Sequence, residues 1–95
     1  MEAKTISPHT KEVQRRFFEA LDRLKEQDKI AGLQTFCTNY NLHKAKYSNI
    51  RSAIRKPEHD GRYKFIDIDA LFYLVKDFGV SANWLLTGRG EMFSK

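Results

Sequence analysis

Hydrophobic and polar residues alternate with a helical period along most of this chain. From Glu12 to about Gln27 the apolar residues recur at spacings of three and four, which predicts one amphipathic helix. Its apolar stripe consists of Val13, Phe17, Ala20, Leu21 and Leu24. The residues expected on the solvent side are Arg16, Glu19, Arg23 and Glu26, with Glu12–Arg16 and Glu19–Arg23 as supporting pairs. Ser7-Pro8 could equally begin this helix earlier, as an N-cap followed by proline.

Two shorter helices follow, joined by about three residues. Leu33, Phe36, Cys37 and Tyr40 recur at helical spacing and predict a two-turn helix that Asn41 ends, since asparagine tolerates the left-handed conformation. A third helix is expected from about Lys44 to Arg55, where Pro57 stops it. Its inward residues would be Tyr47, Ile50 and Ile54. So short a joint makes the two helices cross steeply.

The remaining pattern predicts two more helices and no strand. A helix capped by Asp67 or Asp69 should end at Gly79, and a last short helix should run from the cap Ser81 to Gly88. The expected inward face of the fourth helix is Ile68, Leu71, Phe72, Val75 and Phe78, with Leu74 alongside. The sequence therefore predicts an all-α domain of five helices over residues 11–88. Residues 1–10 would be an N-terminal tail or helix extension, and residues 89–95 a C-terminal tail.

The net charge of +5 is concentrated in one segment. Seven basic and two acidic residues lie between His43 and Lys64, and the rest of the chain is balanced. A localised basic excess is typical of proteins that bind polyanions such as nucleic acid. The alternative interpretation is an ordinary solvated charged surface.

Several other classes of protein are disfavoured by what the sequence lacks. The single cysteine, Cys37, excludes an internal disulfide, and with the three histidines it shows no zinc-ligand spacing. No nucleophile motif, carboxylate pair or phosphate-binding glycine loop points to an enzyme, and no cofactor is expected. The chain shows neither a signal peptide nor an apolar run of about 20 residues, so we expect a cytoplasmic protein without a membrane partner.

Two segments resemble the lambda-repressor-like helix-turn-helix family of phage repressors and their bacterial relatives. They are Leu33–Ile50, LQTFCTNYNLHKAKYSNI, and Phe78–Met92, FGVSANWLLTGRGEM. The resemblance implies a five-helix fold in which the second and third helices form the helix-turn-helix. It also implies that helix 43–55 reads the major groove of double-stranded DNA, that the protein is a repressor-like regulator of transcription, and that it binds DNA as a homodimer. The resemblance also implies that Cys37 occupies the position in the second helix where the motif has a small side chain. Asn41 then occupies the position of the turn between the two helices.

The resemblance and the charge pattern together assign candidate site residues. The expected base-reading residues are Lys44, Ala45, Lys46 and Asn49. The expected phosphate-binding residues are Gln34, His43, Arg51, Arg55, Lys56, Arg62 and Lys64. The apolar end of the chain offers Trp84, Leu85, Met92 and Phe93 as dimer-interface candidates, although Trp84 could instead belong to the core. The competing functional hypothesis is a protein-interaction module of the same fold, such as an antitoxin-like or adaptor domain.

Overall fold

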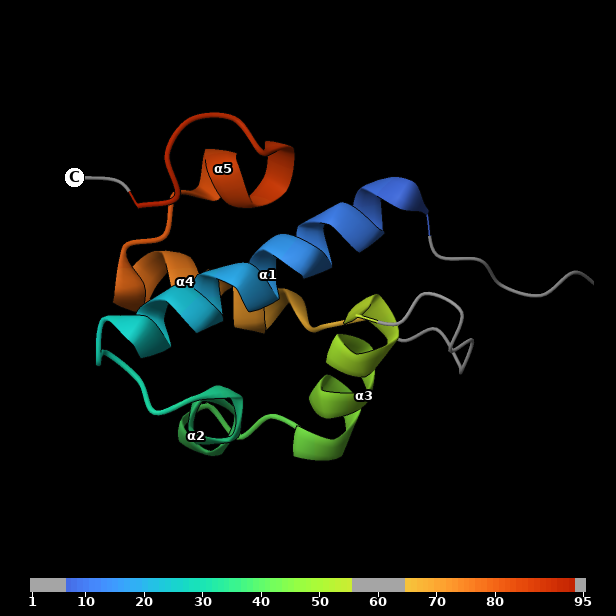
Figure 1. Ribbon diagram of the computed structural model, residues 1–95, viewed down its shortest axis with the longest axis vertical. Coiled ribbons are helices and arrows are strands. Elements are labelled where there is room, and N and C mark those ends of the chain that lie inside the picture. Colours follow the sequence, from blue (N-terminus) through green and yellow to red (C-terminus); the bar gives the residue numbers. More distant parts are fainter. Residues whose placement is uncertain (1–6, 56–64, 94–95) are drawn as a thin grey trace, which may run out of the picture.

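The computed structural model describes residues 7–55 and 65–93, which form five α-helices and no strand (Figure 1). The helices are α1 (Pro8–Glu26), α2 (Leu33–Asn39), α3 (Lys44–Arg55), α4 (Ile68–Phe78) and α5 (Ala82–Thr87). This confirms the expected all-α architecture. In Figure 1 the long helix α1 crosses the middle of the molecule, with α5 on one side and α2 and α3 on the other. No helix among the described residues is both long and apolar enough to span a membrane.

Helix α1 begins at Pro8, so the earlier of the two possible starts is the one observed. The Ser7 side chain accepts a hydrogen bond from the Thr10 amide at 3.1 Å, which is the N-cap geometry. The predicted apolar stripe is buried, apart from Val13, which is partly exposed. Of the expected supporting pairs, Glu12–Arg16 is present at 3.6 Å. Glu19 instead pairs with Arg15, and Arg23 with Glu26.

Aromatic side chains from three helices meet at the centre of the core. The Phe17 ring of α1 lies 5.7 Å from the Phe36 ring of α2 and 5.9 Å from the Tyr47 ring of α3. Phe18 contacts Phe17 edge-on at 4.9 Å. Because ring pairs of this geometry add to the hydrophobic gain of burial, α1 holds both α2 and α3 in place.

The predicted inward face of α4 is wrong in part. The residues that it buries most completely are Ala70 and Leu74, while Ile68 is 81% and Phe72 54% exposed. Tyr73 stacks on Tyr40, the C-cap of α2, at 4.1 Å, and the Tyr40 hydroxyl donates to Asp77 at 2.7 Å. These contacts fix the rotation of α4 and turn Ile68 and Phe72 toward solvent.

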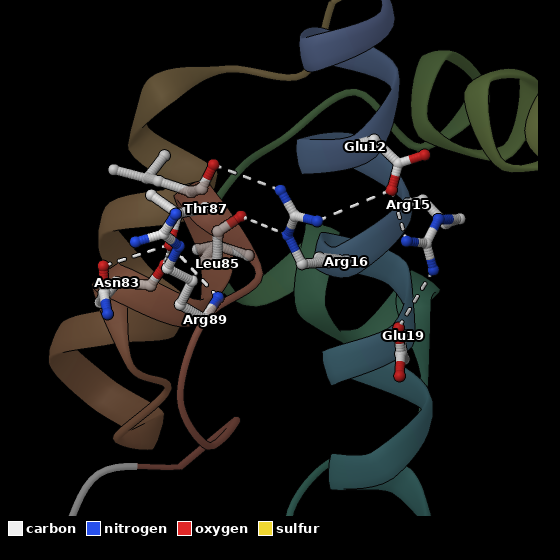
Figure 2. A network of polar contacts seen from close by, with 9 residues as sticks. Glu12, Arg15, Arg16, Glu19, Asn83, Leu85, Thr87 and Arg89 are labelled. Atoms are coloured by element: carbon white, nitrogen blue, oxygen red, sulfur yellow. Dashed lines mark hydrogen bonds and ion pairs between the residues drawn. The ribbon is translucent and has the colours of Figure 1, made fainter.

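Arg16 is buried, which contradicts the prediction that it faces solvent (Figure 2). Its Nε donates to the carbonyl of Leu85 at 2.9 Å, and its Nη2 donates to that of Leu86 at 3.2 Å. These carbonyls lie in the last turn of α5, where no further helical amide can satisfy them. Gly88 then takes a left-handed conformation with φ 80°, and a Cβ at this position would stand only 3.0 Å from Arg16 Nη1. The Arg16 side chain therefore joins α1 to the end of α5.

Part of the expected C-terminal tail packs back on the domain. The Ser81 amide donates to the Met92 carbonyl at 2.7 Å, and Val80 and Phe93 form an isolated antiparallel bridge. Met92 and Phe93 are partly buried against the core. This pairing places residues 92 and 93 beside the segment that begins α5.

Candidate nucleic-acid interface

The joint between α2 and α3 has the geometry predicted from Asn41. This residue takes a left-handed conformation with φ 58°, and the next amide, that of Leu42, donates to the Cys37 carbonyl at 2.8 Å. Cys37 is fully buried, and burial raises the pKa of its thiol, as expected of a packing residue. A small side chain at this position leaves room for α3 to approach α2 closely.

His43 caps the first turn of α3. Its Nδ1 accepts a hydrogen bond from the Lys46 amide at 3.1 Å, which satisfies one of the free amides at the start of the helix. The ring is exposed. A phosphate contact from His43, as the sequence predicts, would therefore have to use the other ring nitrogen, Nε2.

Helix α3 presents one face to the core and another to solvent. Tyr47 and Ile50 are buried, as predicted. The exposed positions of the helix include three of the predicted base-reading residues and two serines that the sequence interpretation missed. They are Lys44, Ala45, Ser48, Asn49 and Ser52. The helical period could have identified the serines, because they stand three positions beyond Ala45 and Asn49, respectively.

Lys46 differs from the other predicted base-reading residues because it is partly buried and already paired. Its Nζ lies 3.3 Å from Asp67 Oδ1. The other carboxylate oxygen of Asp67 accepts a hydrogen bond from the Tyr47 hydroxyl at 2.6 Å, and the Asp67 amide donates to the same hydroxyl at 2.9 Å. We call Lys46, Tyr47 and Asp67 the Asp67 cluster. Asp67 stands at the N-cap of α4, so the cluster joins α3 to the start of α4.

The Asp67 cluster should make part of the stability dependent on pH. The hydrogen bond from Tyr47 and the Lys46 ammonium hold the pKa of Asp67 below its ordinary value, while burial and the Asp67 contact raise the pKa of Tyr47. A lowered carboxyl pKa stabilises the fold above the unfolded value of about 3.9. This contribution is lost as pH falls below that value and through the folded pKa.

We expect Asp67→Asn to lower the free energy of unfolding at pH 7 by about 1 kcal/mol, because the charged acceptor is lost. The difference from the unsubstituted chain should shrink as pH falls below about 4. Urea unfolding at several pH values and constant ionic strength measures this difference. Asp69→Asn, at an exposed carboxyl on the same helix, is the matched control. A difference that stays constant between neutral and acidic pH would contradict the assignment.

The basic residues of α3 lie mainly along one edge of its exposed face. Helical geometry at 3.6 residues per turn aligns Lys44, Arg51 and Arg55 there, and places Lys46 at the opposite edge. Arg51 and Arg55 line a hollow between α1, α3 and the start of α2. Arg55 Nη2 is 3.9 Å from Asp22 Oδ2, and both side chains are more than half exposed.

The other predicted contact residues are placed as follows. Gln34 is exposed in the first turn of α2. Lys56, Arg62 and Lys64 lie outside the described residues. Leu85 is 1% exposed, so its side chain belongs to the core and is not available to a dimer partner. Trp84 is partly buried, like Met92 and Phe93, and the exposed leucine of α5 is Leu86, at 55%.

No group of three or more potential metal ligands is present among the described residues. Comparison of the chain with protein-family models, curated proteins and solved structures gives no match.

Proposed function

We propose that this protein binds double-stranded DNA in a sequence-specific manner, reading the major groove with α3, and that it is a repressor-like regulator of transcription. The observation that carries the proposal is the exposed polar face of α3 with its basic edge. The opposite face of the same helix is fixed in the core by Tyr47 and Ile50. Major-groove reading requires such a rigidly held helix with donors on its free side.

The charge distribution supports a polyanionic partner. The segment from His43 to Lys64 carries the whole excess charge of +5, and α3 contributes most of the basic residues in it. We assign phosphate contacts to Arg51 and Arg55, which lie toward the far end of α3. Gln34, His43, Lys56, Arg62 and Lys64 remain candidates for further phosphate contacts.

The chemistry of the exposed side chains of α3 indicates which of them would contact bases. Asparagine pairs well with adenine N6 and N7, and lysine with guanine O6 and N7, so we assign base reading to Asn49 and Lys44. Ala45 offers an apolar contact for a thymine methyl. Lys46 would have to exchange Asp67 for a base, which makes its contribution smaller than that of Lys44.

The family resemblance supports the regulatory role and the assembly. The segments 33–50 and 78–92 resemble lambda-repressor-like proteins, which commonly bind palindromic operators as dimers. We therefore propose a homodimer on DNA, with two copies of α3 about 34 Å apart, one helical turn of the duplex.

The test is to select bound fragments from random duplex DNA and then measure alanine variants. Replacing Lys44 or Asn49 should cost about 1–3 kcal/mol on the selected site and relax the preference at particular base pairs. Replacing Arg55 should weaken selected and unselected duplexes about equally. Arg89→Ala is the matched control, because the variant loses the same charge at an exposed residue. Arg89 directly follows α5, and α5 lies on the other side of α1 from α3 (Figure 1).

Two results would overturn parts of this proposal. If the Lys44 and Asn49 variants lose selected and unselected binding in equal proportion, α3 only contacts phosphates. If no duplex is enriched and the unsubstituted chain does not bind DNA at low salt, the protein-interaction hypothesis replaces DNA binding.

A further inference from the structure

Helix α4 exposes an apolar surface that the DNA-binding proposal does not use. Ile68 and Phe72 stand four residues apart and therefore lie on one face of the helix; they are 81% and 54% exposed. Phe65, just before the helix, is 52% exposed. We call these three residues the α4 stripe. They are three of the four large hydrophobic residues that are most exposed in the described part of the chain, and Leu86 is the fourth.

The size of the α4 stripe fits a weak protein contact. An aromatic side chain buries roughly 150–250 Å² when it is fully covered. Phe65 and Phe72 are each about half exposed, so together they leave roughly the area of one aromatic side chain uncovered. Ile68 adds to it. A symmetric contact doubles the buried area to several hundred Å², the size of a reversible interface and not of an obligate one.

Two charged residues beside the α4 stripe indicate which partner would cover it. Asp69 and Lys76 are exposed and seven residues apart, so helical geometry places them along the same flank of the stripe. Within residues 7–55 and 65–93, neither side chain takes part in any of the ion pairs. One flank thus carries a negative charge near one end and a positive charge near the other.

This charge order is complementary to itself when two copies of α4 pack antiparallel. A two-fold axis near Phe72 would bring Asp69 of one copy opposite Lys76 of the other, and the same pair would form a second time on the other side of the axis. An isologous interface requires this kind of self-complementarity, in which one patch faces its own copy. Acidic Asp69 and the apolar side chains of the stripe make the surface a poor match for DNA phosphates.

We propose that this protein forms a homodimer through antiparallel packing of α4 against α4 of a second copy. The contact is centred on Phe72, includes Ile68 one helical turn away, and is flanked by two Asp69–Lys76 pairs. This surface replaces the interface expected at Trp84, Leu85, Met92 and Phe93, where Leu85 is buried and the other three are partly covered by the core. Self-association is measured without DNA, so its result is independent of whether the protein binds DNA.

The first experiment is sedimentation equilibrium of the full chain from roughly 10 μM to 1 mM, the range in which a weak dimer forms. The unsubstituted chain should convert from monomer to dimer within this range. Phe72→Asp should raise the dissociation constant by about tenfold or more, because it places a charge beside the two-fold axis, in the centre of the contact. Leu86→Asp is the matched control, since it adds the same charge at a comparably exposed apolar residue on α5, and it should leave the dissociation constant unchanged. Circular dichroism of each variant checks that its helices are intact.

The second experiment exchanges the flanking charges. Asp69→Lys alone and Lys76→Asp alone should each weaken self-association, because each homodimer would place like charges opposite one another. A mixture of these two variants should form a heterodimer more tightly than either forms a homodimer, since both opposing pairs are then attractive. The double variant D69K/K76D should recover self-association.

Three results would overturn the proposal. The first is a chain that stays monomeric at the highest concentration. The second is a dimer that Leu86→Asp disrupts while Phe72→Asp does not. The third is a mixture of the two charge variants that associates no better than each variant alone, because the antiparallel register places opposite charges together at both pairs in that mixture.

Discussion

Raising the salt concentration from about 50 to 200 mM should weaken DNA binding by roughly four orders of magnitude. The reason is counterion release, because each phosphate neutralised by a lysine or arginine frees condensed cations from the duplex. If each subunit makes about four phosphate contacts, a dimer makes about eight, and the slope of log affinity against log salt is roughly −7. Arg51 and Arg55 would supply two contacts per subunit, and the remaining basic residues of 43–64 the others.

Fluorescence anisotropy of a labelled duplex across a salt series measures this slope. Arg55→Ala should make the slope shallower by roughly one unit per subunit, whereas the control Arg89→Ala should leave it unchanged. A slope near zero for the unsubstituted chain would rule out binding through the basic edge of α3. The measurement uses one duplex throughout, so it tests electrostatics independently of base preference.

Replacing Arg16 with methionine should lower the free energy of unfolding by about 2–4 kcal/mol. Methionine fills much of the same space but donates no hydrogen bond, so the carbonyls of Leu85 and Leu86 lose their charged donor. Hydrogen bonds to charged groups contribute roughly 1.5–3 kcal/mol each, and a buried group left without a partner adds a penalty. In a domain of this size the loss corresponds to roughly 10–25 °C in melting temperature.

Arg15→Met is the matched control because Arg15 is the neighbouring arginine on the same helix. Its side chain is 49% exposed and pairs only with Glu12 and Glu19 at the surface, so its replacement should cost less than about 1 kcal/mol. Urea unfolding of both variants at pH 7 makes the comparison. Equal losses for the two arginines would show that burial of Arg16 against α5 contributes no special stability.

The sequence predicted best where a local signal fixes the backbone. Helix α3 has the predicted bounds, Asn41 takes the left-handed conformation, and Gly79 and Gly88 end their helices with positive φ. Each of these features is determined by the backbone preferences of residues within the same segment. The exposed positions Lys44 and Asn49 follow equally directly from the period of α3.

Predictions failed where distant segments decide the outcome. Most residues of α4 are apolar, so its period could not select one inward face. The contacts of Tyr73 and Asp77 with Tyr40 set the rotation instead. Arg16 stands at the edge of the α1 stripe, and only the carbonyls of α5, about 70 positions away, make its burial favourable. Pairing of Lys46 with Asp67 likewise requires the start of α4 to lie beside α3.

Helix α1 supports the helices on both of its sides, and this determines how the molecule unfolds. Helices α2 and α5 have seven and six residues, too few to persist as isolated helices in water. Helix α2 depends on α1 through the Phe17–Phe36 ring contact, and α5 depends on α1 through the hydrogen bonds of Arg16. Helix α3 shares the same support through Tyr47. Loss of α1 would therefore unfold both ends of the structure at once, so the described residues behave as a single cooperative unit in which α3 and α5 melt together.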